Sequence, residues 1–238
     1  HPEFATTMAQ DVYAMPSVTA PAVGRWIQMS VDDALRRRYP YLVHGTWRDP
    51  SVPLNGIQRA HEQGFETHAV AVAVPPTLSR LGLLTRFYEA LDTSPRSARW
   101  TPLEAHETTV NALPTSVEAL ASSPLVTRLT VLSRAGEPLY PANSEPFPAA
   151  TWTPTRASDA RAAFDHEFQR ALTGEEASAY LARYRAALEV HRQHTWTDPQ
   201  ARQAWKRVAQ DREALRRDHG GLLARDDLQR WARRGETP

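Results

Sequence analysis

The sequence contains no cysteine, a single lysine and no long hydrophobic run. A chain without cysteine forms no disulfide, no thiolate metal site and no cysteine nucleophile. No apolar stretch approaches the roughly 20 residues that cross a bilayer, and no segment has the pattern of a signal peptide. We therefore expect a soluble, cytoplasmic protein without a membrane partner.

Several common binding and catalytic motifs are also absent. A phosphate-binding loop of the form GxxxxGK[ST] needs a lysine flanked by Gly and by Ser or Thr, but Lys206 lies between Trp205 and Arg207. The sequence has no GxSxG elbow, no GxGxxG after a strand and no HExxH spacing. These absences argue against an α/β-hydrolase, a dinucleotide-binding domain and a metal held by protein side chains.

Basic and acidic residues are nearly equal in number, but the basic residues are almost all of one type. The chain has 28 basic and 27 acidic residues and a net charge of +1, so it has no overall field that would steer nucleic acid. All basic residues except Lys206 are arginine, which a high-GC genome explains. At 238 residues, the chain is long enough for one large or two small domains.

The segment from Tyr41 to Arg99 predicts the centre of an α/β fold. A short apolar run at 41–43 precedes a helical pattern at 52–63 and an apolar, β-branched segment at 67–74, which together predict a parallel βαβ unit. Ligands in such sheets bind beyond the carboxyl ends of the strands. The polar residues expected at that edge are His44, Thr46, Arg48 and Asp49.

The remaining pattern predicts further helices, a hairpin and a helical tail. Residues 1–22 predict an irregular or partly helical lead-in. A helix over 23–38 is expected to bury Val23, Trp26, Ile27, Val31 and Leu35. Other predicted helices span 76–91, 102–121, 157–172, 174–194, 199–217 and 222–234, with strands at 125–132 and 138–140. A proline-rich linker over 141–154 separates a predicted core, 1–150, from a helical extension, 155–238. We expect Trp196 and Trp205 to pin the tail helices.

Three arginines are candidates for phosphate recognition. Arg48 follows the first predicted strand, Arg86 lies late in a helix and Arg99 lies in the following link. Guanidinium groups bind phosphate bidentately and offset charge during phosphoryl transfer. The alternative is that each is a solvated surface residue. His44 could likewise serve as a general base, bind a substrate hydroxyl or simply bond a backbone carbonyl.

The charge pattern of the tail bears on a third interpretation, an arm that contacts nucleic acid or the ribosome. Arginines such as Arg161, Arg170 and Arg183 alternate with acidic residues such as Asp165 and Glu176. Interleaved charges of this kind are typical of a solvated helix face, so they argue against nucleic-acid binding.

Several short segments, in this order, resemble the zeta toxins, a family of P-loop kinases from bacterial toxin–antitoxin systems. They run from residue 1 to about 140 and are His1-Pro2-Glu3-Phe4, His44-Gly45-Thr46-Trp47-Arg48, Val52-Pro53-Leu54, Gly64-Phe65-Glu66-Thr67, Ala73-Val74-Pro75, Leu81-Gly82, Arg86-Phe87-Tyr88-Glu89, Ser97-Ala98-Arg99-Trp100-Thr101-Pro102, His106 and Asn111-Ala112-Leu113-Pro114.

The resemblance implies an α/β, parallel-sheet, P-loop-kinase-like three-layer core with a helical C-terminal extension. It implies a kinase that uses ATP and Mg²⁺ to phosphorylate the nucleotide sugar UDP-N-acetylglucosamine, and a small helical antitoxin as partner. The residues matching Arg86 and Arg99 contact the ATP phosphates in the family. Those matching Thr46 and Arg48 help to shape the substrate site.

The chain departs from the family pattern in two ways. The phosphate loop, first strand and catalytic aspartate of the family would lie before His1. Two substrate-contacting glutamates of the family fall on His44 and Gln28, which changes the hydrogen bonds available to a sugar. The alternative hypothesis is therefore a catalytically inactive, truncated homologue that serves as a binding protein.

Overall fold

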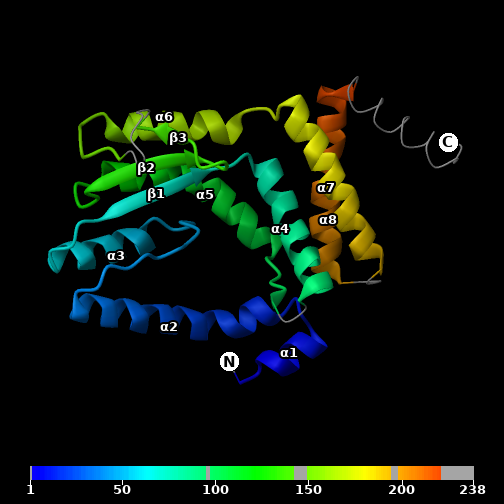
Figure 1. Ribbon diagram of the computed structural model, residues 1–238, viewed down its shortest axis with the longest axis horizontal. Coiled ribbons are helices and arrows are strands. Elements are labelled where there is room, and N and C mark those ends of the chain that lie inside the picture. Colours follow the sequence, from blue (N-terminus) through cyan, green and yellow to red (C-terminus); the bar gives the residue numbers. More distant parts are fainter. Residues whose placement is uncertain (1, 95–96, 142–148, 194–197, 221–238) are drawn as a thin grey trace, which may run out of the picture. The chain divides into compact units, whose positions relative to one another are not determined.

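The computed structural model of the chain describes residues 2–94, 97–141, 149–193 and 198–220 (Figure 1). The chain forms two compact units, one of His1–Pro76 with Glu104–Arg170 and the other of Thr77–Leu103 with Ala171–Pro238. The division into 1–150 and 155–238 stays a prediction. Within the described ranges, no helix has the length and apolar character that a membrane crossing requires.

The first unit contains a three-stranded mixed sheet with the order β1-β2-β3. Strand β1 (His68–Ala73) pairs in parallel with β2 (Arg128–Ser133), and β2 pairs antiparallel with β3 (Pro138–Tyr140). The tight turn between β2 and β3 uses Gly136, whose φ of +85° suits glycine. The predicted strands at 67–74, 125–132 and 138–140 are therefore confirmed.

The predicted strand at 41–43 is wrong. These residues have no regular secondary structure, and Leu42 and Val43 are 89% and 56% exposed. A strand is stable only when a neighbouring strand pairs with its backbone hydrogen-bonding groups, and among the described residues no strand pairs with 41–43. The predicted helix that follows is confirmed as α3 (Ser51–Glu62), and after it Gly64 has a positive φ of 74°, which suits glycine.

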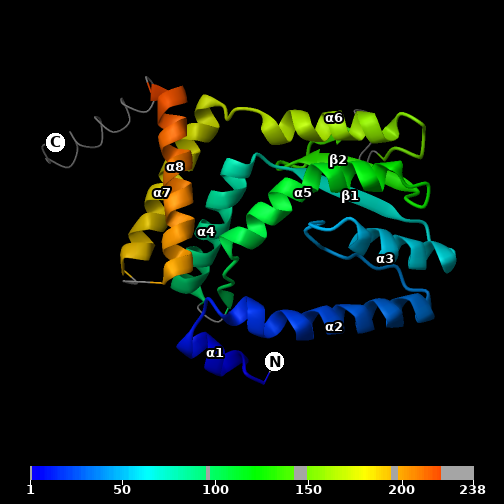
Figure 2. The same ribbon diagram turned by 180° about the vertical axis from the view of Figure 1, so that it is seen from behind.

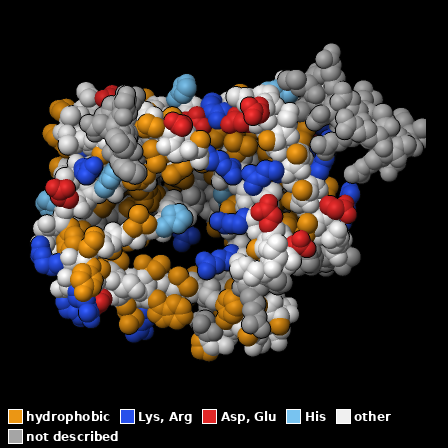
Figure 3. Space-filling view, viewed as in Figure 1, with side chains coloured by type: hydrophobic (Ala, Val, Ile, Leu, Met, Phe, Trp, Pro, Cys, Tyr) orange, Lys and Arg blue, Asp and Glu red, His pale blue; other side chains and the backbone are white. Residues whose placement is uncertain are grey.

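The N-terminal region is more helical than the sequence predicts, and its apolar face is not buried. Helix α1 (Phe4–Gln10) precedes α2 (Met15–Arg37), which begins well before the predicted start. Of the predicted apolar face, Leu35 is buried, whereas Trp26 and Ile27 are 51% and 46% exposed. Figure 3 shows hydrophobic side chains at the surface over α2 and β1. The 3.6-residue spacing predicts the helix correctly but cannot supply a covering partner.

One face of the sheet carries the core of this unit. Strand β1 turns Ala69, Ala71 and Ala73 inward, while Val70 and Val72 on its other face are exposed. The inward residues pack with side chains from α5 (Leu103–Ser122) and α6 (Arg156–Gln169), which Figure 2 shows on this side of the sheet. The predicted helices at 102–121 and 157–172 are thus confirmed, apart from small shifts of their ends.

A buried arginine joins α5, β2 and α6. The Arg156 guanidinium is fully buried and donates hydrogen bonds to the carbonyl oxygens of Ala121, Val126 and Ser123 at 2.8, 2.8 and 2.7 Å. Burial lowers the pKa of Arg156 from its ordinary value. The three carbonyls end α5 and lead into β2, so one side chain fixes the start of α6 against both.

In the part that the structure describes, the second unit is built from α4 (Pro76–Thr93), α7 (Gly174–Gln193) and α8 (Pro199–Asp218). Their predicted spans are confirmed, and the predicted helix at 222–234, Trp196 and residues 142–148 of the predicted linker lie outside the described residues. Helix α8 is capped at its N-terminus by Asp198, whose carboxylate accepts hydrogen bonds from the amides of Gln200 and Ala201 at 2.7 and 3.2 Å. Proline at the first helical position suits this start.

Candidate functional site

The loop that carries His44, Thr46 and Arg48 lies in the first unit between α2 and α3. All three side chains are exposed, whereas Trp47 is half-buried and packs against the core cluster. The Ser116 hydroxyl on α5 donates a hydrogen bond to the Trp47 carbonyl at 2.6 Å. Trp47 has a φ of +52°, which costs free energy in a residue other than glycine. The loop is therefore held at Trp47, with the candidate residues facing solvent on both sides.

Asp49 ends this loop by bonding the start of α3, so its carboxylate is already engaged within the chain. Its carboxylate accepts the Ser51 amide at 2.9 Å at the start of α3. Hydrogen bonds from the Ser51 hydroxyl and amide lower the pKa of Asp49 from its ordinary value. Asp49 is thus an ionised residue that organises the first turn of α3.

Gln28 lies on the exposed surface of α2, where its amide bonds a neighbouring carboxylate. The Gln28 side-chain nitrogen donates to Asp32 at 2.7 Å, and Asp32 also pairs with Arg59 of α3 at 2.5 Å. The hydrogen bonds from Arg59 and Gln28 lower the pKa of Asp32. Among the residues that the structure describes, no hydrogen bond joins Gln28 to His44, Thr46 or Arg48. The structure therefore does not connect Gln28 to this loop through a direct contact.

Arg86 and Arg99 lie in the second unit, each between two buried neighbours. Thr85 and Phe87 are 2% and 1% exposed, and Arg86 between them is exposed. Ala98 and Trp100 are buried on either side of Arg99, which is also exposed.

The two arginine segments contact each other through their buried neighbours. The rings of Phe87 and Trp100 pack edge to face with centroids 5.0 Å apart. Neither guanidinium has a hydrogen bond or ion pair within the described part of the chain. The structure thus brings the Arg86 and Arg99 segments together and leaves both charges open to solvent. Arg48 belongs to the other unit, so its role in phosphate recognition alongside Arg86 and Arg99 stays a prediction.

The donor set of these residues fits phosphate. Two arginines present paired N–H groups that match phosphate oxygens, and an exposed arginine retains its charge. In the described ranges, no three or more His, Cys, Asp or Glu side chains come together as a metal site. The residues present therefore suit the phosphates of a nucleotide, and we assign none of them to magnesium.

Comparison with solved structures defines the class of fold. A structure from the PezAT chromosomal toxin–antitoxin system of Streptococcus pneumoniae superimposes with a TM-score of 0.62 over 80% of this chain and 70% of that chain, at 19% sequence identity. The predicted α/β, P-loop-kinase-like fold is thereby confirmed.

Sequence comparison defines the family. The family model for zeta toxin matches residues 1–145, which is more than half of the chain. The chain belongs to the zeta toxin family.

Individual relatives agree with this family match. The chain is 27% identical to the zeta toxin of Enterococcus hirae over 82% of its own length and 63% of the relative's length. It is 25% identical to the zeta toxin of Streptococcus agalactiae, covering 90% of this chain and 69% of the relative. The toxin PezT of S. pneumoniae is 29% identical over 59% of this chain and 56% of its own length.

Sequence reasoning missed the residues that support the candidates. Asp32 could have been found, because Gln28 and Asp32 are four positions apart on one helix and such residues are neighbours. Ser116 could not, because it is 69 positions from Trp47 and has no local signal. The prediction that Trp205 pins a tail helix is confirmed within the second unit, where its indole nitrogen donates to the Tyr88 hydroxyl at 2.9 Å.

Proposed function

We propose that the protein is an ATP-dependent small-molecule kinase that acts as a bacterial toxin in the cytoplasm. The observation that carries this proposal is the pair of solvent-open guanidinium groups, Arg86 and Arg99, held on adjoining anchored segments within the region that matches the zeta toxin family. Such a pair suits binding of the phosphates and stabilisation of charge during transfer. ATP would supply the transferable phosphoryl group.

The proposed acceptor is a nucleotide sugar, UDP-N-acetylglucosamine or a related compound. The exposed loop with His44, Thr46 and Arg48, together with Gln28, would bind it. Thr46 and His44 can hydrogen-bond sugar hydroxyls, and Arg48 can pair with a diphosphate. Anchoring at Trp47 supports this role, because a binding group on a held backbone loses less conformational entropy when the ligand arrives.

We also propose a small antitoxin protein as partner. The structural relative comes from a toxin–antitoxin system, and the chain belongs to a toxin family. The inactive binding homologue remains the second candidate, because His44 and Gln28 stand where the family has glutamates. The two candidates differ in one measurable property, which is turnover.

The full product of the gene, including any residues encoded before His1, should be incubated with ATP, magnesium and UDP-N-acetylglucosamine. We expect ADP and a singly phosphorylated sugar nucleotide, detected by mass spectrometry. ATP binding without ADP formation would favour the inactive homologue. Failure to bind ATP, measured by calorimetry, would contradict both the kinase and its proposed phosphate site.

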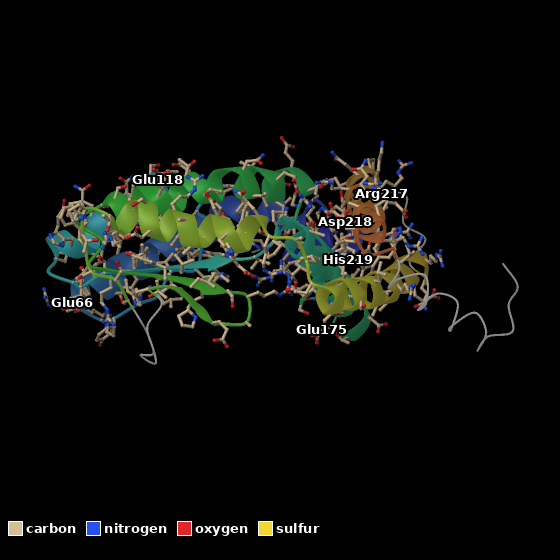
Figure 4. The ribbon with its side chains drawn as sticks, turned by 90° about the horizontal axis from the view of Figure 1, so that it is seen from above. Glu66, Glu118, Glu175, Arg217, Asp218 and His219 are labelled. Atoms are coloured by element: carbon tan, nitrogen blue, oxygen red, sulfur yellow. The ribbon has the colours of Figure 1, made fainter. Side chains whose placement is uncertain are left out.

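Replacing Arg99 tests the assigned phosphate contact. We expect Arg99→Ala to lower turnover at least about tenfold, since charge-stabilising arginines contribute that much or more to phosphoryl transfer. The control is Arg217→Ala, which removes an exposed arginine from the last turn of α8, labelled in Figure 4, and should leave turnover unchanged. Equal turnover of both variants would remove Arg99 from the site.

A further inference from the structure

Helix α4 is held at the positions next to Arg86 by polar contacts as well as by apolar packing. The Arg183 guanidinium on α7 donates to the Thr85 hydroxyl at 2.9 Å. On the other side of Arg86, the rings of Phe87 and Tyr88 pack at 5.3 Å. Both residues next to Arg86 therefore have fixed surroundings, which restricts the backbone from which the guanidinium projects.

Tyr88 is the buried centre of a polar cluster that joins α4 to α7 and α8. Its hydroxyl accepts the Trp205 indole N–H at 2.9 Å and lies 2.8 Å from His191 Nδ1. Because hydroxyl oxygens accept and donate at once, Tyr88 can satisfy both neighbours. The Trp205 ring lies 5.7 Å from Tyr88 and 5.2 Å from His191. This cluster, Tyr88, His191 and Trp205, fixes the turn of α4 that follows Arg86.

A separate contact holds the segment that carries Arg99. The Trp100 indole donates to the Gln200 side-chain oxygen at 3.1 Å, and Trp100 is 3% exposed. Gln200 lies in the first turn of α8, where its amide is capped by Asp198. Gln200 itself is exposed, so its side chain is available for substitution without opening the core.

We infer that α7 and α8 are positioning elements for the nucleotide-phosphate site, with Gln200 acting through Arg99 and with Trp205 and Arg183 acting through Arg86. The inference rests on the proposed function and extends it to residues 171–218, all of which lie beyond the family match over residues 1–145. Pre-set guanidinium groups bind a transferring phosphoryl group without first losing conformational freedom.

A double-mutant cycle on the full gene product separates positioning from plain stability. We expect Gln200→Ala to raise KM for ATP about three- to tenfold, the range for one lost hydrogen bond, with a smaller change in melting temperature than in a core variant. In an Arg99→Ala background the same substitution should have no further effect on KM, because Gln200 acts through Arg99. The matched control, Gln203→Ala, changes an exposed glutamine one turn further along α8.

The proposed action of Trp205 through Arg86 is tested in the same way with Trp205→Phe, which keeps an aromatic ring and removes the N–H. We expect its effect on KM for ATP to disappear in the Arg86→Ala background. Effects that add fully in both cycles would show that the helices contribute stability alone, and would overturn the inference.

A second measurement makes the test independent of turnover. Hydrogen exchange of the amides at 97–103 should be faster in Gln200→Ala than in wild type and unchanged in Gln203→Ala. Unchanged exchange in Gln200→Ala would overturn the inference even if the kinase is active. Absence of ATP binding by the wild type, with exchange altered as expected, would instead count against the proposed function.

Discussion

At the scale of single residues, the candidates share one arrangement. Arg86 and Arg99 are exposed between buried neighbours, and Thr46 and Arg48 flank the anchored Trp47. An exposed charge on a fixed backbone can reach a ligand while its own position varies little. This arrangement distinguishes these residues from the many arginines on solvated helix faces, which the sequence alone cannot do.

His44 offers the sharpest residue-level test of acceptor choice. We expect His44→Glu to raise kcat/KM for UDP-N-acetylglucosamine about fivefold, because a carboxylate accepts a sugar hydroxyl more strongly than an imidazole does. His61→Glu, an equivalent change at an exposed position in the last turn of α3, is the control. If activity with this sugar stays constant or falls, His44 does not determine the specificity.

At the scale of elements, the contact between α4 and α8 depends on a buried ion pair. Arg80 and Asp211 are 7% and 6% exposed, and their charged atoms lie 2.8 Å apart. Asp211 also pairs with Arg207 at 3.1 Å, one turn away on α8. Removing one member of a buried pair leaves the other charge uncompensated, which costs more than the pair itself is worth.

We therefore expect Asp211→Asn to lower the free energy of unfolding by about 3 to 5 kcal/mol, measured by urea denaturation. Asp218→Asn is the control, because this exposed residue ends α8, as Figure 4 shows, and should change stability by less than about 0.5 kcal/mol. The double variant Arg80→Met with Asp211→Leu should recover much of the loss. A small effect of Asp211→Asn alone would mean that the pair is not buried in solution.

At the scale of the whole molecule, each unit has its own core, and the second unit contains a titratable group that links its stability to pH. The Tyr180 hydroxyl is buried and donates to the Val208 carbonyl at 3.1 Å. Burial, and then the nearby Asp211 charge, raise the pKa of Tyr180 far above its ordinary value of 10.0. The folded form therefore keeps this proton at pH values where the unfolded chain loses it.

The raised pKa of Tyr180 determines the sign of the pH dependence. The stabilising contribution of Tyr180 is fully present at pH values below the pKa of an unfolded tyrosine. Above about pH 10, the free energy of unfolding falls by about 1.4 kcal/mol per pH unit. We expect Tyr180→Phe to be less stable near neutral pH but to lose less stability above about pH 10. The control is Tyr39→Phe, at an exposed position, which should keep the wild-type dependence of unfolding free energy on pH, measured by urea denaturation. If the unfolding free energies of wild type and Tyr180→Phe changed equally with pH above about pH 10, Tyr180 would not be the source of this pH dependence.

Much of the architecture could be predicted from local signals. Residues within a few positions of one another set helical periodicity, capping and turn geometry, so the spans of α3, α4, α5, α7 and α8 and the turn at Gly136 follow from the sequence. The ordered short motifs also identify the family. The same motifs contain Arg86, Arg99 and the 44–48 loop, so the sequence by itself determines these candidates.

Only the tertiary structure decided which segments pair and which surfaces are buried. The choice of β2 as the partner of β1, the exposure of Trp26 on α2 and the irregular 41–43 segment depend on groups far away in the chain. The anchors of the candidate site are equally remote, since Trp47 and Ser116 are 69 positions apart and Trp100 and Gln200 are 100 apart. The sequence pattern of a segment indicates its local conformational preference. Strand pairing and burial are set by contacts between distant segments, which form only when the chain folds.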